Sequence, residues 1–262
     1  MSDTHGKFVW YELLTPDTAA AAKFYHDVIG WNAKDSGMPG VDFEYTIFEV
    51  PNHDRGIAGM LPLAAEMKAQ GIPPNWSGYV AVDDVDATAA KFVDLGGKIW
   101  RPAADIPGVG RFAVVADLHG AAIIVFKPAP MDGPPPEDLP MGTPGANGWH
   151  ELYAGDAEEA LEFYSKVFGW TKDSEMDMGP LGKYLLFAHN GKMIGGIMTK
   201  EPNIPVPCWG YYFCVDSIDA ALERVTSAGG QVLNGPMEVP GDAWVIQCTD
   251  PQGAYFSLVG GR

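Results

Sequence analysis

Apolar and polar residues alternate in a pattern that predicts a strand followed by a helix near the start of the chain. Residues 7–15 have the aromatic and aliphatic character of a strand. Asp17 then suits a helix N-cap, because its carboxylate can accept from the free N–H groups of the first turn. Gly30 suits the left-handed end of the same helix. The apolar positions between them have helical spacing: Ala21, Phe24, Tyr25 and Val28.

This unit recurs four times along the chain. The same Asp-to-Gly spacing is found in four segments: Asp17–Gly30, Asp83–Gly96, Asp156–Gly169 and Asp216–Gly229. Short β runs follow the helices, for example Phe43–Val50 and Arg55–Leu61, then Arg111–Ala116 and Ala121–Phe126. The pattern predicts an α+β fold built from four β-α-β-β-β modules.

A longer repeat divides the chain into two halves. "WYELLTPDTAAAAKFYHDVIGW", from Trp10 to Trp31, and "WHELYAGDAEEALEFYSKVFGW", from Trp149 to Trp170, share ten of 22 positions. The stretch between the halves is too rich in Pro and Gly for regular structure. We therefore expect two homologous domains, 1–128 and 147–262, joined by a linker over 129–146.

Composition narrows the class of protein. The formal charge of −17 argues against nucleic acid and anionic membranes as partners, because both need a basic surface. No apolar run approaches the ~20 residues of a membrane span. The three cysteines form no CxxC pair, and the N-terminus lacks a secretory pattern. We expect a cytoplasmic protein, a monomer or homodimer, whose partner is a small molecule.

The sequence resembles the vicinal oxygen chelate superfamily, the group of glyoxalase I, bleomycin resistance proteins and extradiol dioxygenases. The resemblance is carried by "ELLTPDTAAAAKFYHDVIGW", "DDVDATAAKFVDLGGKI" and the closing "DPQGAYFSL". It implies two modules side by side in each domain, with eight strands curved into an open cup and the helices outside. It also implies a divalent metal held in the cup.

The positions that the resemblance assigns to metal ligands carry unsuitable residues. They fall on Trp10, Ser77, Ile124, Trp149, Gly210 and Ser257, and near Gly59 and Gly196. Divalent metals need carboxylate, imidazole or thiolate donors. We therefore expect neither a metal nor another cofactor.

The alternation of strand side chains selects other residues for the cup. Glu12 and Glu151 are the candidate acid–base groups, because a partly buried carboxyl group beside Trp can act as a general acid or base. The candidate ligand-binding residues are Trp149, Tyr153, Tyr212, Tyr255, Ser257, Trp10 and Tyr79. More of them belong to the second cup, so we expect it to be the better site.

Two interpretations of these residues remain open. Glu12 and Glu151 are either ligand-facing groups or structural carboxylates, and the two tryptophans either line the cup or fill it. Three functions follow: a metal-free protein that binds a small organic molecule, a metal-independent enzyme that acts on a carbonyl or aromatic compound through Glu, or a metal-dependent lyase or dioxygenase. Of these, the sequence favours the first two.

Overall fold

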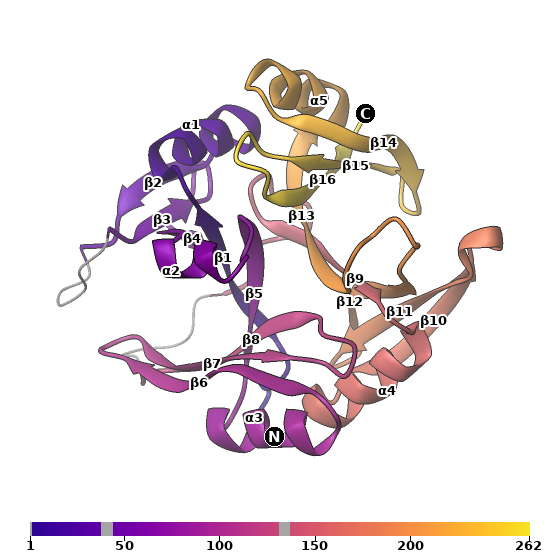
Figure 1. Cartoon of the computed structure of the whole chain (residues 1–262). Helices are drawn as coiled ribbons and strands as arrows, with labels where there is room; N and C mark the ends of the chain where they lie inside the picture. Colours follow the sequence, from indigo (N-terminus) through magenta and orange to yellow (C-terminus); the bar gives the residue numbers. More distant parts are fainter. Residues whose placement is uncertain (1, 38–43, 131–136) are drawn as a thin grey trace. The chain divides into compact units, whose positions relative to one another are not determined.

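The computed structural model describes residues 2–37, 44–130 and 137–262. Within these residues, sixteen strands form two eight-stranded sheets, in the order β2-β3-β4-β1-β5-β8-β7-β6 and β10-β11-β12-β9-β13-β16-β15-β14 (Figure 1). The strands of the first sheet are β1 (Phe8–Thr15), β2 (Asn32–Asp35), β3 (Thr46–Glu49), β4 (Gly56–Pro62), β5 (Asn75–Ala81), β6 (Lys98–Ile106), β7 (Gly110–Ala116) and β8 (Ala122–Pro128). Those of the second are β9 (Asn147–Ala154), β10 (Thr171–Asp177), β11 (Lys183–His189), β12 (Lys192–Thr199), β13 (Cys208–Ser217), β14 (Gln231–Val239), β15 (Ala243–Thr249) and β16 (Tyr255–Gly261).

Each β-α-β-β-β module contains one main helix. These are α1 (Thr18–Ile29), α3 (Val85–Asp94), α4 (Ala157–Phe168) and α5 (Ile218–Ser227); a short α2 (Ala65–Ala69) and a 3-10 turn η1 (Gly179–Leu181) are additions. The predicted fold of four such modules is therefore confirmed. None of the helices in the described part of the chain is long and apolar enough to cross a membrane.

The helix ends follow from local chemistry. The Asp17 carboxylate accepts from the Ala20 N–H at 2.9 Å, and Asp156 accepts from the Glu159 N–H at 2.9 Å. These bonds satisfy first-turn donors that have no partner inside the helix. At the other end of α1, Gly30 has a φ of 89°, a left-handed conformation that glycine adopts without steric cost. The caps expected at these positions are confirmed.

The chain folds into two compact units, and each unit takes parts of both sequence repeats. The first compact unit consists of Met1–Val9, Ser77–Glu137 and Trp149–Trp209. The second consists of Trp10–Trp76, Asp138–Gly148 and Gly210–Arg262. Part of the linker expected over 129–146 lies outside the described residues, which omit 131–136.

Aromatic residues and one buried aspartate hold the second compact unit together. The Tyr25 hydroxyl accepts from Trp76 Nε1 at 2.8 Å and donates to the Asp250 carboxylate at 3.1 Å. All three residues are buried. Helices α1 and α5, which come from opposite ends of the chain, contact each other in this unit (Figure 1). Burial raises the pKa of both Tyr25 and Asp250.

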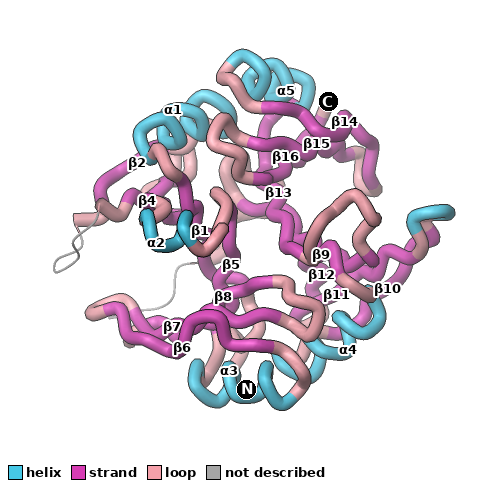
Figure 2. The backbone as a smooth tube through the Cα atoms, in the orientation of Figure 1, coloured by secondary structure: helices cyan, strands magenta, loops and turns pink. Residues whose placement is uncertain are grey.

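The first compact unit repeats this arrangement with its own residues. The Tyr164 hydroxyl accepts from Trp209 Nε1 at 3.3 Å and donates to Asp117 at 3.2 Å. Helices α3 and α4 contact each other (Figure 2). Phe92 on α3 and Phe163 on α4 have ring centroids 5.1 Å apart. Tyr25 and Tyr164 are thus core residues, and for Tyr25 the helical spacing of the apolar positions already indicated a place on the helix stripe.

Candidate functional site

The first compact unit contains a hydrogen-bonded cluster built on β9. Trp149, Glu151 and Tyr153 occupy every second position of this strand, so their side chains lie on the same face of the sheet. Tyr184, on β11, joins them: Trp149 Nε1 donates to its hydroxyl at 2.8 Å, and that hydroxyl donates to Glu151 Oε1 at 2.8 Å. The Tyr153 hydroxyl donates to the other carboxylate oxygen, Oε2. We call these four residues the Glu151 cluster.

The burial of these side chains is graded across the cluster. Glu151 and Tyr153 are each only 7% exposed, whereas Trp149 and Tyr184 are half-buried. A buried carboxylate loses its hydration, and hydroxyl donors to both oxygens offset that loss. The Glu151 cluster therefore combines two half-buried aromatic rings with a buried carboxyl group.

A glycine makes room for the Tyr184 hydroxyl. Gly196 on β12 pairs with Glu151 in the parallel β9–β12 ladder. A Cβ atom at Gly196 would overlap the ring and hydroxyl of Tyr184. Any larger residue at this position would displace the tyrosine from Glu151, so the cluster depends on the absence of a side chain there.

The second compact unit contains an equivalent arrangement, the Glu12 cluster, made of Trp10, Glu12 and Tyr45. Trp10 Nε1 donates to the Tyr45 hydroxyl at 2.9 Å, and this hydroxyl donates to Glu12 Oε2 at 3.4 Å. Gly59 pairs with Glu12, and a Cβ atom there would overlap Tyr45. Burial and the nearby Glu12 charge raise the pKa of Tyr45 well above its ordinary value, so its hydroxyl stays protonated at neutral pH.

The two clusters differ at one position. Tyr153 of the Glu151 cluster corresponds to Leu14 in the Glu12 cluster, since the opening repeats align them. Leu14 has no hydroxyl to donate, and the Tyr45–Glu12 hydrogen bond is 0.6 Å longer than the 2.8 Å bond from Tyr184 to Glu151. The Glu151 cluster thus contains one hydroxyl more than the Glu12 cluster.

The remaining predicted ligand-binding residues lie elsewhere. Tyr79, on β5 in the first compact unit, packs edge-to-face on Phe126 at 5.7 Å. Tyr212, Tyr255 and Ser257 belong to the second compact unit. There, Tyr212 pairs with Ser257 across β13 and β16, and Gln247 Nε2 donates to the Tyr212 hydroxyl at 3.0 Å. Ser257 Oγ donates to the Tyr255 hydroxyl at 3.4 Å.

The residues at the implied metal-ligand positions do not fit a divalent cation. In the first compact unit these positions carry Ser77, Ile124, Trp149 and Gly196, and none of them offers a carboxylate, imidazole or thiolate donor. The space beside Gly196 holds the Tyr184 hydroxyl. Across residues 2–37, 44–130 and 137–262, no group of three or more His, Cys, Asp or Glu is placed to hold a metal ion.

His150 points away from the Glu151 cluster, because successive side chains of a strand lie on opposite faces of the sheet. Its ring stacks on Phe8 at 3.8 Å, and its Nδ1 donates to the Ile194 carbonyl at 2.6 Å. Burial lowers the pKa of His150 to about 4, so the imidazole is neutral at physiological pH. His150 is therefore a core residue rather than a partner of Glu151.

The cysteines are poor nucleophiles. Burial raises the pKa of Cys208 and Cys214 to about 11 and that of Cys248 to about 12. The thiol rather than the thiolate is present at neutral pH, and the thiol reacts slowly. Cysteine chemistry is not indicated for this site.

Tyr45 and Tyr184 were not identified from the sequence, although a signal was present. They are separated by 139 residues, the same offset that relates Trp10 to Trp149 and Glu12 to Glu151. Extending the opening repeat beyond Trp31 would have aligned them. Their role depends on strand register, which brings β11 close to β9 through β12.

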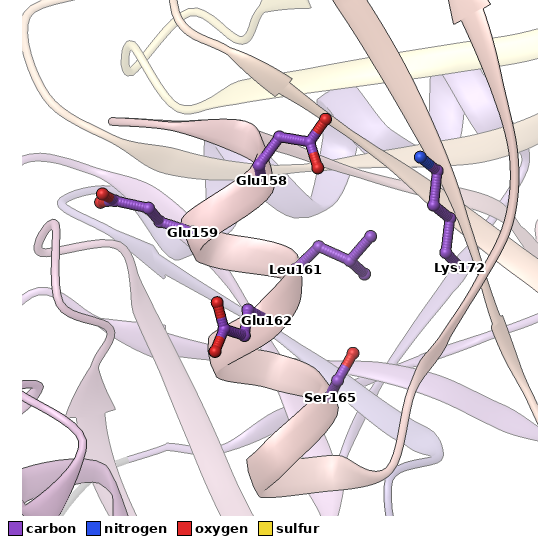
Figure 3. A pocket seen from close by; sticks show the side chains of 6 residues that line it. All are labelled: Glu158, Glu159, Leu161, Glu162, Ser165 and Lys172. Atoms are coloured by element: carbon purple, nitrogen blue, oxygen red, sulfur yellow. The ribbon is translucent and has the colours of Figure 1, made fainter.

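Two surface hollows lie at a different place from the clusters. One, of about 390 Å³, runs along α4 and is lined by Glu158, Glu159, Leu161, Glu162, Ser165 and Lys172 (Figure 3). The other, of about 190 Å³, lies between α1 and the strands β2–β4 and includes Thr18, Lys34 and Met60. In Figure 3 the carboxylates of α4 point outward and Lys172 stands across from them. The hollow along α4 is lined mainly by charged side chains and by no aromatic residue, whereas ligand sites are usually lined by hydrophobic and aromatic side chains.

Sequence relatives extend over nearly the whole chain. "Putative glyoxylase CFP32" of Mycobacterium tuberculosis is 36% identical over 253 residues, covering 95% of this chain and 93% of the relative. "Anthracycline biosynthesis protein DnrV" of Streptomyces peucetius is 32% identical over 266 residues, covering 97% and 93%. Both relatives therefore have the same two-repeat length as this chain.

Solved structures share the fold. The Mn(II)-bound glyoxalase from Novosphingobium aromaticivorans superimposes with a TM-score of 0.64 at 17% identity, covering 98% of this chain and 82% of that one. The 2,2',3-trihydroxybiphenyl 1,2-dioxygenase from Sphingomonas wittichii gives 0.65 at 14% identity, covering 99% and 91%. The model of the Glyoxalase/Bleomycin resistance protein/Dioxygenase superfamily matches residues 7–125 and 148–258. The chain therefore belongs to the Glyoxalase/Bleomycin resistance protein/Dioxygenase superfamily.

Proposed function

We propose that this chain binds a small planar organic molecule at the Glu151 cluster and does so without a metal. The observation that carries the proposal is the continuous hydrogen-bonded series from Trp149 through Tyr184 to Glu151. It combines a large apolar ring with a hydroxyl and a carboxylate. An apolar surface with a few fixed polar groups is the usual make-up of a ligand site.

The aromatic part of the cluster supplies most of the binding surface. Trp149 and Tyr184 are half-buried and retain accessible area. A planar ligand that covers an indole face gains apolar burial and favourable ring geometry, which contribute about 0.5–1.5 kcal/mol beyond the area term. This surface favours aromatic ligands over sugars or aliphatic acids.

The sequence relatives support an aromatic or carbonyl ligand. One relative is named for anthracycline biosynthesis and another as a putative glyoxylase, each over more than nine-tenths of this chain. The first name points to fused aromatic rings and the second to carbonyl compounds. A ligand that is planar and carries ring carbonyl groups satisfies both.

Catalysis by Glu151 is the second candidate function. The Tyr184 hydroxyl donates directly to Glu151, so a proton donor and a proton acceptor lie side by side. Such a pair can move a proton at a carbon next to a carbonyl, with the carboxylate as base and the phenol as hydrogen-bond donor to the developing oxyanion. This activity needs no metal.

Ligand binding and metal content test the proposal together. Titration with flavone, a planar three-ring ketone, should quench tryptophan fluorescence, and Trp149→Leu should weaken the binding. Elemental analysis of the purified protein should find manganese, zinc, iron and nickel only at background level. Stoichiometric metal whose removal abolishes binding would refute metal independence. Binding that survives Trp149→Leu unchanged would place the ligand elsewhere.

A further inference from the structure

We infer that strand β6 is the docking surface for a second copy of this chain, with the two copies related by a two-fold axis and Trp100 as the central contact. β6 is the last strand in the order of the first sheet, so one of its edges faces no other strand of that sheet (Figure 1). The inference goes beyond the proposed function, because this edge is separate from the Glu151 cluster on β9 and β11.

Trp100 is the extra residue of a β-bulge at this edge. The register passes from the pair Ile99–Val115 directly to Arg101–Val114, and Trp100 is skipped. A bulge of this kind re-aims the side chain of its extra residue. The Trp100 side chain is 58% exposed. Tryptophan is enriched in protein–protein interfaces, where its burial contributes strongly to binding.

The neighbours of Trp100 extend its apolar surface. Ile99 is 41% exposed, and Val93 is 49% exposed at the end of α3, a helix that contacts β6. The Arg101 guanidinium lies 4.7 Å from the ring centroid of Phe112, on the neighbouring strand β7. This contact directs the positive charge toward the sheet rather than outward from its edge. The exposed edge is therefore an apolar patch of the kind that marks interaction surfaces.

The order of residues along β6 makes the strand complementary to a second copy of itself. Its first half is basic and bulky and its second half is small and acidic, in the order Lys98, Ile99, Trp100, Arg101, Pro102, Ala103, Ala104 and Asp105. In an antiparallel two-fold arrangement, the first half of each copy lies beside the second half of the other. Trp100 then faces Ala103 of the second copy, and Lys98 faces Asp105 of the second copy. A two-fold interface makes each of these contacts twice.

The charges at the two ends of β6 are available for such a contact. Asp105 is 73% exposed and shares the Arg111 guanidinium with Asp86, at 3.0 Å from Nη1 and 2.7 Å from Nε respectively. Two carboxylates around one guanidinium leave an excess negative charge, which a lysine from another chain can neutralise. Lys98 is exposed but lies seven positions from Asp105, about 23 Å along the strand. The two residues can therefore pair only between chains.

The contact is formed by side chains and does not continue the sheet. Pro102 has no N–H to donate, and the bulge at Trp100 interrupts the regular spacing of backbone donors. An edge strand with a few neighbouring residues forms a small interface, typical of transient association. We therefore expect a dissociation constant of about 1–100 µM.

Strand β14 provides a matched comparison within the chain. Leu233 corresponds to Trp100 at the repeat offset of 133 residues, is the skipped residue of an equivalent bulge and is 55% exposed. The position of Lys98, however, carries the neutral Gln231, and the position of Ala104 carries the large Met237. β14 thus lacks both the basic residue and the small residue that make β6 complementary to itself. We assign the dimer contact to β6 alone.

Sedimentation velocity of the intact chain tests the inference. The wild type should form a dimer as its concentration rises from about 1 to about 500 µM in about 0.15 M salt, which screens the repulsion between two chains of charge −17 beyond ~8 Å. Trp100→Glu should weaken the dimer by about a hundredfold or more, because an aromatic contact is lost twice. Leu233→Glu makes the same charge change at the matched position and should leave the dimer as in the wild type.

Charge reversal tests the two-fold arrangement. Lys98→Glu and Asp105→Lys should each weaken self-association about tenfold, because each places like charges opposite one another twice. An equal mixture of the two variants should regain the wild-type affinity. In the mixed dimer one contact pairs the two reversed charges, and the other pairs the native Lys98 with the native Asp105. Melting curves confirm that each variant is folded at the assay temperature.

Three other outcomes would overturn the inference. A wild type that stays monomeric over the whole concentration range would exclude a second copy as the occupant of this edge. A dimer disrupted by Leu233→Glu and unaffected by Trp100→Glu would place the interface on β14. Charge variants that fail to recover on mixing would refute the antiparallel two-fold contact. None of these outcomes bears on ligand binding at the Glu151 cluster, which the flavone titration measures separately.

Discussion

The Tyr25 hydroxyl donates to the Asp250 carboxylate 3.1 Å away, and this hydrogen bond links the first helix of the chain to its last β-hairpin. Tyr25 lies in α1 and Asp250 follows β15 directly. Both residues are buried. The bond joins the two sequence repeats inside the second compact unit, and Tyr164–Asp117 does the same in the first.

Because each compact unit contains both repeats, we expect separated repeats to fold poorly. A fragment of residues 1–128 keeps Tyr25 and loses Asp250, which leaves a buried hydroxyl without its acceptor at a cost of about 1–3 kcal/mol. It also loses the apolar surface of α5. Size-exclusion chromatography and circular dichroism should show this fragment to be unfolded or self-associated.

Co-expression with residues 129–262 should restore a one-to-one complex with the melting behaviour of the intact chain. The complementary fragment alone serves as the control. A monomeric 1–128 fragment with a cooperative thermal transition would contradict the expectation that each repeat needs the other in order to fold.

The sequence was sufficient to predict the modules but not their pairing into compact units. Asp17, Gly30 and the helical stripe through Tyr25 encode a strand and a helix locally, and the structure confirms them. The hydrogen bond from Tyr25 to Asp250 forms only because α1 packs against the end of β15. A local sequence pattern does not encode packing between segments so far apart in the chain. For the same reason Glu151 was identified from strand alternation, while Tyr184 was missed. Its place beside Glu151 is set by the register of β11, β12 and β9.

Burial of the thiols predicts low cysteine reactivity. The pKa of Cys208 is raised to about 11 by burial and by the nearby Glu151 charge, although this residue is half-buried rather than fully covered. At pH 7.5 the thiolate fraction is then about a thousandth or less. We expect Ellman's reagent to label the folded protein slowly and all three cysteines quickly in urea. Rapid stoichiometric labelling of Cys208 in the folded state would contradict this.

Acidification should lower the free energy of unfolding through protonation of the buried His150. The folded-state pKa of His150 is lowered by burial to about 4, against 6.5 for a free imidazole. The unfolded chain therefore binds more protons between these values, and the stability contributed by neutral His150 is present above pH 6.5 and lost as the pH falls toward 4. The full effect is about 3 kcal/mol.

Urea unfolding at pH 7 and pH 4.5 measures this effect. Burial also raises the pKa values of Asp117 and Asp250, and these raised values act in the opposite sense to His150 because they favour the folded state on acidification. Comparison with His150→Phe isolates the histidine, because the variant keeps the ring stacked on Phe8 and has no titrating group. The variant should lose less stability on acidification than the wild type. An identical loss in both proteins would show that His150 does not contribute.

The two clusters allow the role of Glu151 to be measured against an internal control. Glu151→Gln keeps the size of the side chain and removes the charge that accepts from Tyr184 and Tyr153. Loss of one charge-assisted hydrogen bond to the ligand costs about 1.5–3 kcal/mol, roughly ten- to a hundredfold in affinity or rate. The amide oxygen can still accept from a tyrosine, so we expect the loss of folding stability to be smaller, about 1 kcal/mol or a few degrees in melting temperature.

Glu12→Gln should change the ligand affinity and the melting temperature less than Glu151→Gln does. Glu12 has the longer hydrogen bond, and Leu14 stands beside it on the strand in place of a second tyrosine. Isothermal titration with a hydroxylated flavone, whose hydroxyl can donate to the carboxylate, and thermal melting, performed on both variants, separate the two roles of the carboxylate. Affinity lost at a nearly unchanged melting temperature assigns Glu151 to the ligand. A melting temperature lowered by about ten degrees or more, on the order of 3 kcal/mol, with binding intact below it, would instead make Glu151 a structural carboxylate that holds β9 to β11 through Tyr184.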